Sequence, residues 1–259
     1  MKVGIAGAGG RMGRLLIELV LAADGMTLAA ATAREGDEAF GKTVAPGVLA
    51  TDDASELFRL SDVVIDFTLP TATAAHAKLA GETGTALLVG TTGLGPAERE
   101  ALAQAARSAP VLVAANTSLG VVLMQSLVRQ AAASLGEDWD IEIVEMHHRH
   151  KIDAPSGTAW ALGQAAAEGR KVDLDAVADR GRDGHTGARK QGAIGFASLR
   201  GGDVAGEHTV IYAGASERIE LTHKANDRRV FAVGALRAAR WLAGKPAGSY
   251  RMADVLGLG

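Results

Sequence analysis

The segment Val3–Gly13 reads V-G-I-A-G-A-G-G-R-M-G. A short apolar run, typical of a buried strand, leads directly into a glycine-rich turn, and a helical pattern follows from Arg11. This order places free backbone N–H groups and the positive end of a helix dipole where a pyrophosphate can bind. The spacing departs from the standard G-x-G-x-x-G, because Gly7, Gly10 and Gly13 give G-x-x-G-x-x-G. A glycine turn with a purely structural role is therefore the alternative.

The alternation that begins here continues to about residue 118. The expected strands are Val3–Ala6, Leu28–Thr32, Val63–Phe67, Ala86–Val89 and Val111–Ala114. The expected helices between them include Arg11–Ala23, Thr71–Thr83 and Pro96–Ser108. Apolar strands that alternate with helices of this length predict a parallel sheet covered on both faces. Such sheets bind ligands at the carboxyl ends of their strands.

After Ser118 the pattern changes to a mixture of helix and alternating strands. A helix is expected over Gly120–Leu135, and strands are expected at Asp140–Met146, Ile194–Leu199, His208–Ala213 and Arg218–His223. The polar segment Val172–Gly192 is interpreted as a long loop, and Arg229–Ala243 as an amphipathic helix. We therefore expect an α/β protein with a Rossmann-type doubly wound parallel sheet in residues 1–118, completed by residues 228–259. Residues 119–227 should form a second, α+β domain with a mixed or antiparallel sheet.

Composition excludes several classes of function. The 259 residues include 27 basic and 30 acidic side chains, which leaves no electrostatic footprint for nucleic acid. The chain has no cysteine, so disulfides, thiolate metal sites and cysteine nucleophiles are excluded. No apolar run reaches the roughly 20 residues that cross a bilayer, and no cleavable leader is recognisable. We expect a cytoplasmic protein without a membrane partner.

The residue after the second strand bears on the choice of cofactor. An acidic residue about 20 positions beyond the glycine motif normally binds the ribose of NAD. That position is Ala33, which cannot accept a hydrogen bond, and the guanidinium of Arg34 follows and suits the 2′-phosphate of NADP. Glu35 is one residue later and could still reach the ribose, and Arg34 could be an ordinary surface charge. We predict that NADPH is preferred and that NADH is also accepted.

Several reactive side chains fall together in Glu145–Lys151, which reads E-M-H-H-R-H-K at the end of an expected strand. The residues D-A-P-S-G-T-A follow, and Ser156 is expected to cap a helix that runs to about Glu168. Gly157 and Thr158 then lie in a first turn whose backbone N–H groups lack helical partners. A helix start beside histidines and a lysine predicts a site for a carboxylate substrate next to groups that exchange protons.

This cluster has three other possible interpretations. A zinc site could use His147, His148 and His150, but adjacent residues of a strand point to opposite faces, so no metal is predicted. Ser156 as a nucleophile lacks the G-x-S-x-G elbow. A purely structural cluster of hydrogen-bonded histidines is the remaining alternative.

At these residues the sequence resembles the dihydrodipicolinate reductases. The stretch Glu145–Ala159, E-M-H-H-R-H-K-I-D-A-P-S-G-T-A, is similar to the signature of that family, and the glycine loop is similar to the family's cofactor loop. The resemblance extends in order over nearly the whole chain, through Asp66-Phe67-Thr68, Gly90-Thr91-Thr92-Gly93, Gly201-Gly202 and Gly206-Glu207-His208.

The resemblance implies an NAD(P)H-dependent oxidoreductase of lysine and diaminopimelate biosynthesis. Its reaction would be the reduction of 4-hydroxy-tetrahydrodipicolinate, a small dicarboxylate, to tetrahydrodipicolinate with loss of water, in a homotetramer. By the same resemblance, His147 is the acid/base residue and Lys151 the proton donor, while His148, Gly157 and Thr158 contact the substrate. The implied cofactor-binding residues are Gly7, Ala8, Gly9, Gly10, Arg11, Met12, Arg34, Gly90, Thr91, Thr92, Ala114, Ala115, Asn116 and Thr117.

Two positions depart from the pattern of this family. Ala33 replaces a common acidic residue, which puts tight NADH binding in doubt, and Thr117 stands where an aromatic residue is frequent. Another two-domain dehydrogenase, such as an aspartate dehydrogenase or an oxidoreductase on a sugar or semialdehyde, would share the fold but should lack H-H-R-H-K followed by P-S-G-T. A non-catalytic dinucleotide sensor would not need this cluster.

Overall fold

The structure is a computed structural model that describes residues 1–258. The chain forms two compact units. The first, which we term the N-terminal unit, comprises Met1–Leu119 and the segment that begins at Arg229. The second unit comprises Gly120–Arg228. No helix of residues 1–258 combines the length and the apolar character that crossing a membrane requires.

The N-terminal unit is built on an eight-stranded sheet in which every neighbouring pair of strands is parallel except β3 and β4. Across the sheet, the strands are β13 (Gly248–Tyr250), β7 (Pro110–Val113), β6 (Ala86–Val89), β5 (Val63–Asp66), β1 (Lys2–Ala6), β2 (Thr27–Thr32), β4 (Val48–Thr51) and β3 (Thr43–Ala45). Strand β1 lies between β5 and β2, so the order of the strands reverses there. In open sheets of this kind, the crevice at the carboxyl ends beside the reversal is the ligand site.

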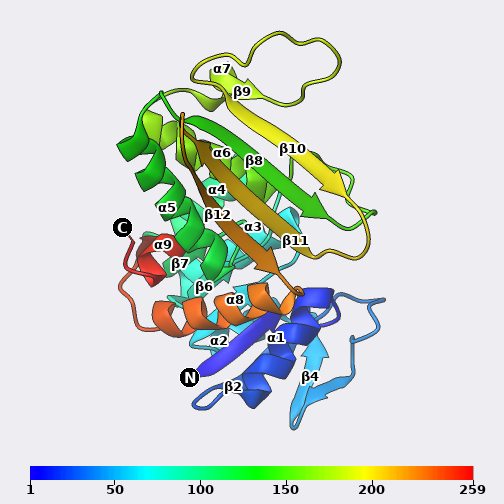
Figure 1. Ribbon diagram of the computed structural model, residues 1–259. Helices are drawn as coiled ribbons and strands as arrows, with labels where there is room; N and C mark the ends of the chain where they lie inside the picture. The colour runs from blue at the N-terminus through cyan, green and yellow to red at the C-terminus, as the bar shows by residue number, and fades with distance from the viewer. Residues whose placement is uncertain (259) are drawn as a thin grey trace. The chain divides into compact units, whose positions relative to one another are not determined.

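Helices accompany the parallel strands of this unit (Figure 1). They are α1 (Arg11–Ala22), α2 (Ala54–Leu60), α3 (Pro70–Thr83), α4 (Pro96–Ala105), α8 (Arg229–Leu242) and α9 (Met252–Val255). Helix α8 comes from the C-terminal segment and packs against α1, where Arg229 pairs with Glu18 at 2.9 Å. The α8 backbone also lies directly on the loop after β7, because a methyl group at Gly234 would collide with the carbonyl oxygen of Thr117.

The second unit is a five-stranded mixed sheet. Across the sheet, its strands are β12 (Arg218–Ala225), β11 (Gly206–Ala213), β8 (Asp140–His147), β10 (Ile194–Arg200) and β9 (Ala178–Asp179). Strand β8 pairs in parallel with β10 and antiparallel with β11. Helices α5 (Leu119–Leu135) and α6 (Gly157–Arg170) pack on one face, as Figure 1 shows, and their apolar residues join Ile141, Ile143 and Tyr212 in one buried core.

The predicted fold class is confirmed, and the differences concern short elements. Strands β3, β4 and β13 and helices α2 and α9 were not predicted, because elements of three to seven residues carry too little periodicity. The expected loop Val172–Gly192 is partly wrong: it contains α7 (Leu174–Val177) and β9. Strand β9 exists because its two residues pair with Ile194 and Gly195 of β10, a contact that local sequence does not reveal.

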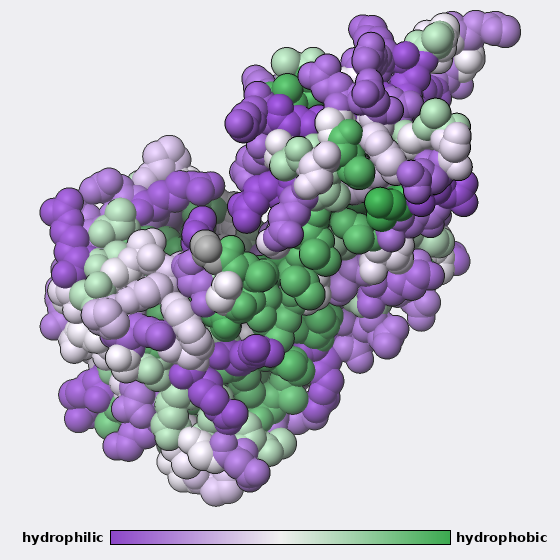
Figure 2. Space-filling view, turned by 60° about the vertical axis from the view of Figure 1, so that its left-hand side comes forward, coloured by the Kyte–Doolittle hydropathy of each residue, from purple (hydrophilic) through white to green (hydrophobic). Residues whose placement is uncertain are grey.

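Helix α5 leaves part of its apolar surface uncovered within its own unit. Leu123 and Leu127 are 45% and 41% exposed, although their neighbours Met124 and Val128 are buried. Figure 2 shows that exposed apolar residues gather in one region of the face it displays, with polar residues over most of the rest. Helix α5 therefore has a wider apolar stripe than the core of its own unit needs.

Candidate active site

The glycine-rich turn after β1 is folded tightly around its own backbone. Gly7 has a φ of +80°, which favours glycine, and its N–H donates to the carbonyl of Thr32 at 3.0 Å. A methyl group at Gly13 would collide with the carbonyl of Gly7, so the start of α1 can approach the turn only without a side chain. No side chain caps α1 at Gly10. The N–H groups of its first turn are thus available to a phosphate, and the loop fits a dinucleotide.

The other predicted cofactor-binding residues end strands of the same sheet. Gly90–Thr92 follow β6, Ala114–Thr117 follow β7 and Arg34 follows β2. Hydrogen bonds hold these ends together, since Gly90 N–H donates to the carbonyl of Asp66 at 2.8 Å and Ala114 N–H donates to that of Val89 at 2.9 Å. Because β1, β5, β6 and β7 pair in parallel, the predicted residues lie together along the side of the sheet where the strands have their carboxyl ends.

Thr117 contacts helix α8. It is 1% exposed, and its hydroxyl donates to the carbonyl of Phe231 on α8 at 2.7 Å. In this position Thr117 anchors α8 to the loop after β7, and its hydroxyl is already engaged. The threonine that replaces the aromatic residue noted in the sequence therefore makes a hydrogen bond within the N-terminal unit.

A buried carboxylate at the same edge was not among the predicted site residues. Asp66 ends β5 with no exposure, and its Oδ2 lies 2.9 Å from Nδ1 of His76 and 2.8 Å from the hydroxyl of Thr73. Burial by itself raises the pKa of Asp66, but the hydrogen bond and charge of His76, together with the hydrogen bonds from Thr68 and Thr73, outweigh it, so the pKa lies below its ordinary value. Thr91 bonds to the same group, with its hydroxyl 3.3 Å from Asp66 Oδ1. Asp66 thus fixes the loop that contains Gly90–Thr92.

In the second unit, strand β8 turns its odd-numbered residues inward. Glu145 and His147 are both buried, and His147 Nδ1 lies 2.6 Å from Glu145 Oε2. This contact favours the tautomer in which Nδ1 carries the proton and leaves Nε2 as the unprotonated ring nitrogen. A methyl group at Gly206 would come within 3.0 Å of Nε2, so the glycine keeps that nitrogen accessible.

Two residues from the neighbouring strands complete the surroundings of Glu145. The guanidinium of Arg200, on β10, donates to both carboxylate oxygens at 2.8 Å. His208, on β11, packs edge-on against His147 with ring centroids 5.1 Å apart, and its Nε2 lies 3.0 Å from the hydroxyl of Ser156. Neither residue was predicted as a site residue, although Gly201-Gly202, which follow Arg200, and Gly206-Glu207-His208 carry part of the family resemblance. Only the pairing of β8 with β10 and β11 reveals their role.

The protonation states of this cluster follow from burial and charge. Burial raises the pKa of Glu145, but the hydrogen bonds from Arg200 and His147 outweigh it and lower the pKa to about 2. Burial lowers the pKa of His147, Glu145 acts in the opposite direction, and the positive charges of Lys151 and Arg200 add to the lowering. Burial also lowers the pKa of His208, to about 4. Near neutral pH the cluster therefore holds an ionised Glu145 and neutral histidines.

The remaining predicted residues lie around the start of α6. The hydroxyl of Ser156 accepts the N–H of Ala159 at 3.1 Å, so the expected N-cap is confirmed. Gly157 is exposed and would have no atom within 4 Å of an added methyl group. Lys151 Nζ pairs with Asp153 Oδ1 at 2.9 Å. His148 Nδ1 is buried and has no hydrogen-bond partner among residues 1–258, which leaves a polar atom for a ligand to satisfy.

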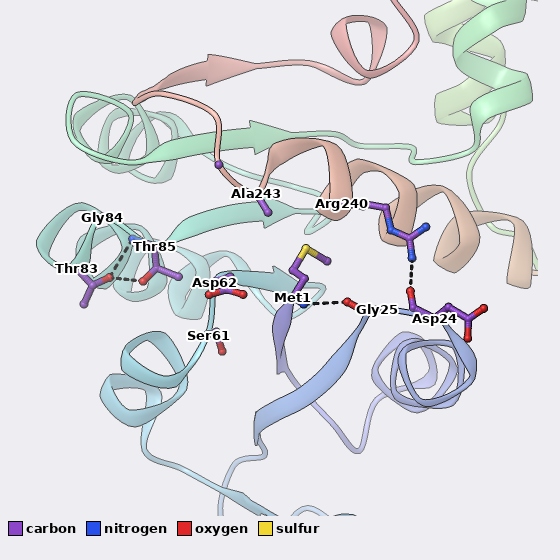
Figure 3. Close-up of a pocket in the computed structure, with 11 residues that line it drawn as sticks. Met1, Asp24, Gly25, Ser61, Asp62, Thr83, Gly84, Thr85, Arg240 and Ala243 are labelled. Atoms are coloured by element: carbon purple, nitrogen blue, oxygen red, sulfur yellow. Dashed lines mark hydrogen bonds between the residues drawn. The ribbon is translucent and has the colours of Figure 1, made fainter.

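A cavity of about 730 Å³ opens at the opposite edge of the N-terminal sheet. Met1, Asp62 and Thr85, which precede β1, β5 and β6, contribute to its wall, and Arg240 of α8 donates to the carbonyl of Asp24 at 2.9 Å beside it (Figure 3). No predicted site residue lines this cavity. It faces the amino ends of the strands, where parallel sheets of this kind do not bind their cofactors.

Comparison with known proteins points to one family. Family models described as dihydrodipicolinate reductase, N-terminus and C-terminus, match residues 1–117 and 120–256. A 4-hydroxy-tetrahydrodipicolinate reductase from Ruegeria sp. is 54% identical over 98% of this chain and 97% of its own length. One from Rhodopseudomonas palustris is 52% identical over 100% and 98%. A solved dipicolinate-bound dihydrodipicolinate reductase from Paenisporosarcina sp. has a TM-score of 0.82 and 25% identity, with 98% of each chain covered.

Proposed function

Because the chain belongs to the dihydrodipicolinate reductase family, we propose that it reduces 4-hydroxy-tetrahydrodipicolinate to tetrahydrodipicolinate, with loss of water and with a nicotinamide cofactor as the reductant. This step belongs to the biosynthesis of diaminopimelate and lysine. The observation that carries the proposal is the buried Glu145–His147 pair, followed within ten residues by Lys151 and by the start of α6. Reduction of a cyclic diacid needs groups that transfer protons and a site that binds carboxylates. Here these are a histidine of fixed tautomer, an ammonium group and the start of a helix.

The N-terminal unit has the features that a dinucleotide requires. Gly7–Met12 would hold the pyrophosphate, because Gly13 permits the close approach of α1 and no side chain occupies the first-turn N–H groups. Gly90–Thr92 and Ala114–Asn116 would line the nicotinamide side, positioned by the Asp66 network. When bound, the reduced cofactor supplies a hydride. The residues around it determine its position and exclude alternative orientations.

The proposed roles in the second unit follow from the protonation states. His147 is neutral near pH 7 and donates its Nδ1 proton to Glu145, so its Nε2 is suited to accept or relay a proton. Lys151, paired with Asp153, is then the group that donates a proton as negative charge develops on the substrate. Glu145 acts through His147 and is a positioning residue, and Arg200 holds Glu145 in place.

The diacid would be bound at the start of α6. Gly157 and Thr158 lie in its first turn, where the helix dipole attracts a carboxylate. The buried Nδ1 of His148 offers a further hydrogen bond. Two anchored carboxylates fix the plane of the ring and therefore the face that receives the hydride.

The reaction is tested directly by the oxidation of reduced cofactor. Freshly prepared substrate, made from pyruvate and aspartate semialdehyde by the preceding enzyme, should cause loss of absorbance at the nicotinamide band. The controls omit the substrate or replace it with oxaloacetate and ammonium or with a sugar lactone. Turnover with oxaloacetate and ammonium, in place of the cyclic diacid, would instead favour an aspartate dehydrogenase, because reductive amination is the direction of that reaction which consumes reduced cofactor. No turnover with any of these would favour a non-catalytic sensor.

The cofactor preference is proposed to be NADPH, with NADH also accepted. Ala33 is buried and offers no hydrogen bond, whereas Arg34 is exposed beside the glycine loop. Replacing Arg34 with alanine should lower kcat/KM for NADPH about tenfold or more, the effect of losing one charge-assisted hydrogen bond, and should change kcat/KM for NADH little. Arg107→Ala, an exposed arginine just beyond α4, serves as the control. Equal losses with both cofactors would contradict the role of Arg34.

Two further proposals rest on the family alone. We propose a homotetramer, to be measured by light scattering after size-exclusion chromatography, where a monomer at working concentrations would contradict it. We also propose that the enzyme acts in the cytoplasm, which fractionation of cells with an antibody to this chain would check.

A further inference from the structure

A tight turn follows strand β2 and sends the chain back toward the glycine loop. Asp37 N–H donates to the carbonyl of Arg34 at 3.0 Å, and Gly36 has a φ of +83°. A hydrogen bond between the first and fourth residues, with glycine in the left-handed region at the third, is a type II β-turn. The turn reverses the chain directly after Ala33, the position that normally carries the acidic ribose ligand.

The carboxylate of Asp37 lies against Gly9. A methyl group at Gly9 would collide with Oδ1, Cγ and Oδ2 of Asp37. Gly9 has no positive φ, and the carboxylate of Asp37 occupies the space in which a Cβ atom at residue 9 would lie. In dinucleotide-binding sheets, the ligand of the ribose is an acidic residue that follows the second strand and lies near the glycine turn. Asp37 has this position.

One oxygen of this carboxylate is already engaged. Asp37 Oδ1 accepts the N–H of Ala39 at 2.9 Å, which fixes the side chain. Oδ2 accepts no hydrogen bond from any of the residues described, and Asp37 forms no ion pair with them. A half-buried, oriented carboxylate thus keeps one oxygen for another donor.

The neighbouring charges do not cancel that of Asp37. Arg14 donates to the carbonyl of Gly9 at 3.0 Å and pairs with Glu38 at 2.9 Å, so its charge is balanced by Glu38. Arg34 is exposed at the start of the turn. Besides the exposed Glu35 of the same turn, the ribose end of a bound dinucleotide would therefore meet the anion Asp37 and the cation Arg34.

We propose that Asp37 is a specificity-determining residue for the cofactor. Its free oxygen accepts a hydrogen bond from a ribose hydroxyl of NADH and repels the 2′-phosphate of NADPH, so it opposes Arg34 and allows NADH to be used although Ala33 cannot bind it. This inference rests on the proposed function, namely that the Gly7–Met12 loop holds a nicotinamide dinucleotide.

The test is the ratio of kcat/KM for NADPH to that for NADH. Asp37→Asn keeps the shape of the side chain and the acceptor for Ala39 N–H but removes the charge, and should raise this ratio about tenfold, through a loss with NADH and a gain with NADPH. Asp37→Ala, which removes the group altogether, should shift the ratio in the same direction. Glu35→Gln tests the alternative that Glu35, the other acidic residue of this turn, is the ribose ligand. Glu100→Gln, an exposed residue of α4, is the control and should leave the ratio within about twofold.

A binding measurement separates failure of this inference from failure of the proposed function. Calorimetry with 5′-AMP and with adenosine 2′,5′-bisphosphate compares two probes that differ only in the 2′-phosphate and needs no turnover. Asp37→Asn should bind the bisphosphate more tightly relative to AMP than the unchanged protein does. If the unchanged protein binds both probes and Asp37→Asn leaves their ratio unaltered, the role of Asp37 is wrong and the proposed function stands. If Glu35→Gln shifts the ratio and Asp37→Asn does not, Glu35 is the ribose ligand. If the unchanged protein binds neither probe nor NADPH, both proposals fail.

Discussion

Replacement of Lys151 by alanine, or of His147 by alanine, is expected to lower kcat by about 10²–10⁴-fold, the range for loss of a general acid or base. The change should fall mainly on kcat, because neither residue is proposed to hold the carboxylates. The assay is steady-state oxidation of NADPH with saturating substrate. The affinity for NADPH, measured by calorimetry, should be little altered, since every proposed cofactor-binding residue belongs to the N-terminal unit.

Matched substitutions are available for both residues. Lys190 and His185 are exposed in the loop before β10, and their replacement by alanine removes the same side chains away from the cluster. Both controls should retain kcat within about twofold, as surface changes generally do. Should Lys151→Ala and His147→Ala each keep near-normal kcat, the roles assigned to these two residues would be wrong, even if the description of the fold is correct.

Replacement of Glu145 by glutamine is expected to lower the free energy of unfolding by about 3 kcal/mol, the cost of breaking a buried ion pair while its partner remains. Glu145 is 1% exposed and accepts hydrogen bonds from Arg200, from His147 and from the backbone N–H of Ser156. Glutamine provides only one acceptor oxygen, and its amide group would face a donor. The variant should also have a lower kcat, because His147 loses the partner that fixes its tautomer. Urea unfolding monitored by circular dichroism measures the first effect.

Glu142→Gln is the matched control, on the same strand and likewise paired with arginine, here with Arg182 at 2.7 Å and Arg189 at 2.8 Å. Its side chain is 27% exposed, so the expected loss is at most about 1 kcal/mol. Losses of equal size in the two variants would show that burial of Glu145 does not matter.

The contribution of Glu145 to stability should depend on pH in a defined direction. The pKa of Glu145 is about 2 in the folded chain, below its ordinary 4.5, so the folded state binds its proton less readily than the unfolded state does. The stabilisation is therefore complete above about pH 4.5 and is lost as the pH falls toward 2. The difference in unfolding free energy between the unchanged protein and Glu145→Gln should be largest at neutral pH and should shrink in acid. A difference that grows below pH 4.5 would contradict this assignment.

Many helices and strands could be predicted from the sequence, because each depends mainly on residues that are close together in the chain. The buried strands Val63–Asp66 and Ala86–Val89 are apolar runs, and α1 has helical periodicity, so both patterns report their structure locally. Ser156 caps α6 through a hydrogen bond to a residue three positions away, which is why a short motif sufficed. The alternation of Asp140–Met146 likewise predicted the half-buried strand β8.

Other features exist only because distant segments meet. Arg200 bonds to Glu145 across 55 positions, and β13 joins the first sheet by pairing with β7 from the far end of the chain. The ribose side of the proposed cofactor site is the clearest case: the sequence pointed to Ala33 and Arg34, whereas a turn through Gly36 brings Asp37 onto Gly9. Residue type and spacing thus determined which elements form and which chemical groups the chain carries. Which groups lie in contact depended on strand pairing and turn geometry, because hydrogen bonds and charges act over a few ångströms in space and not along the sequence.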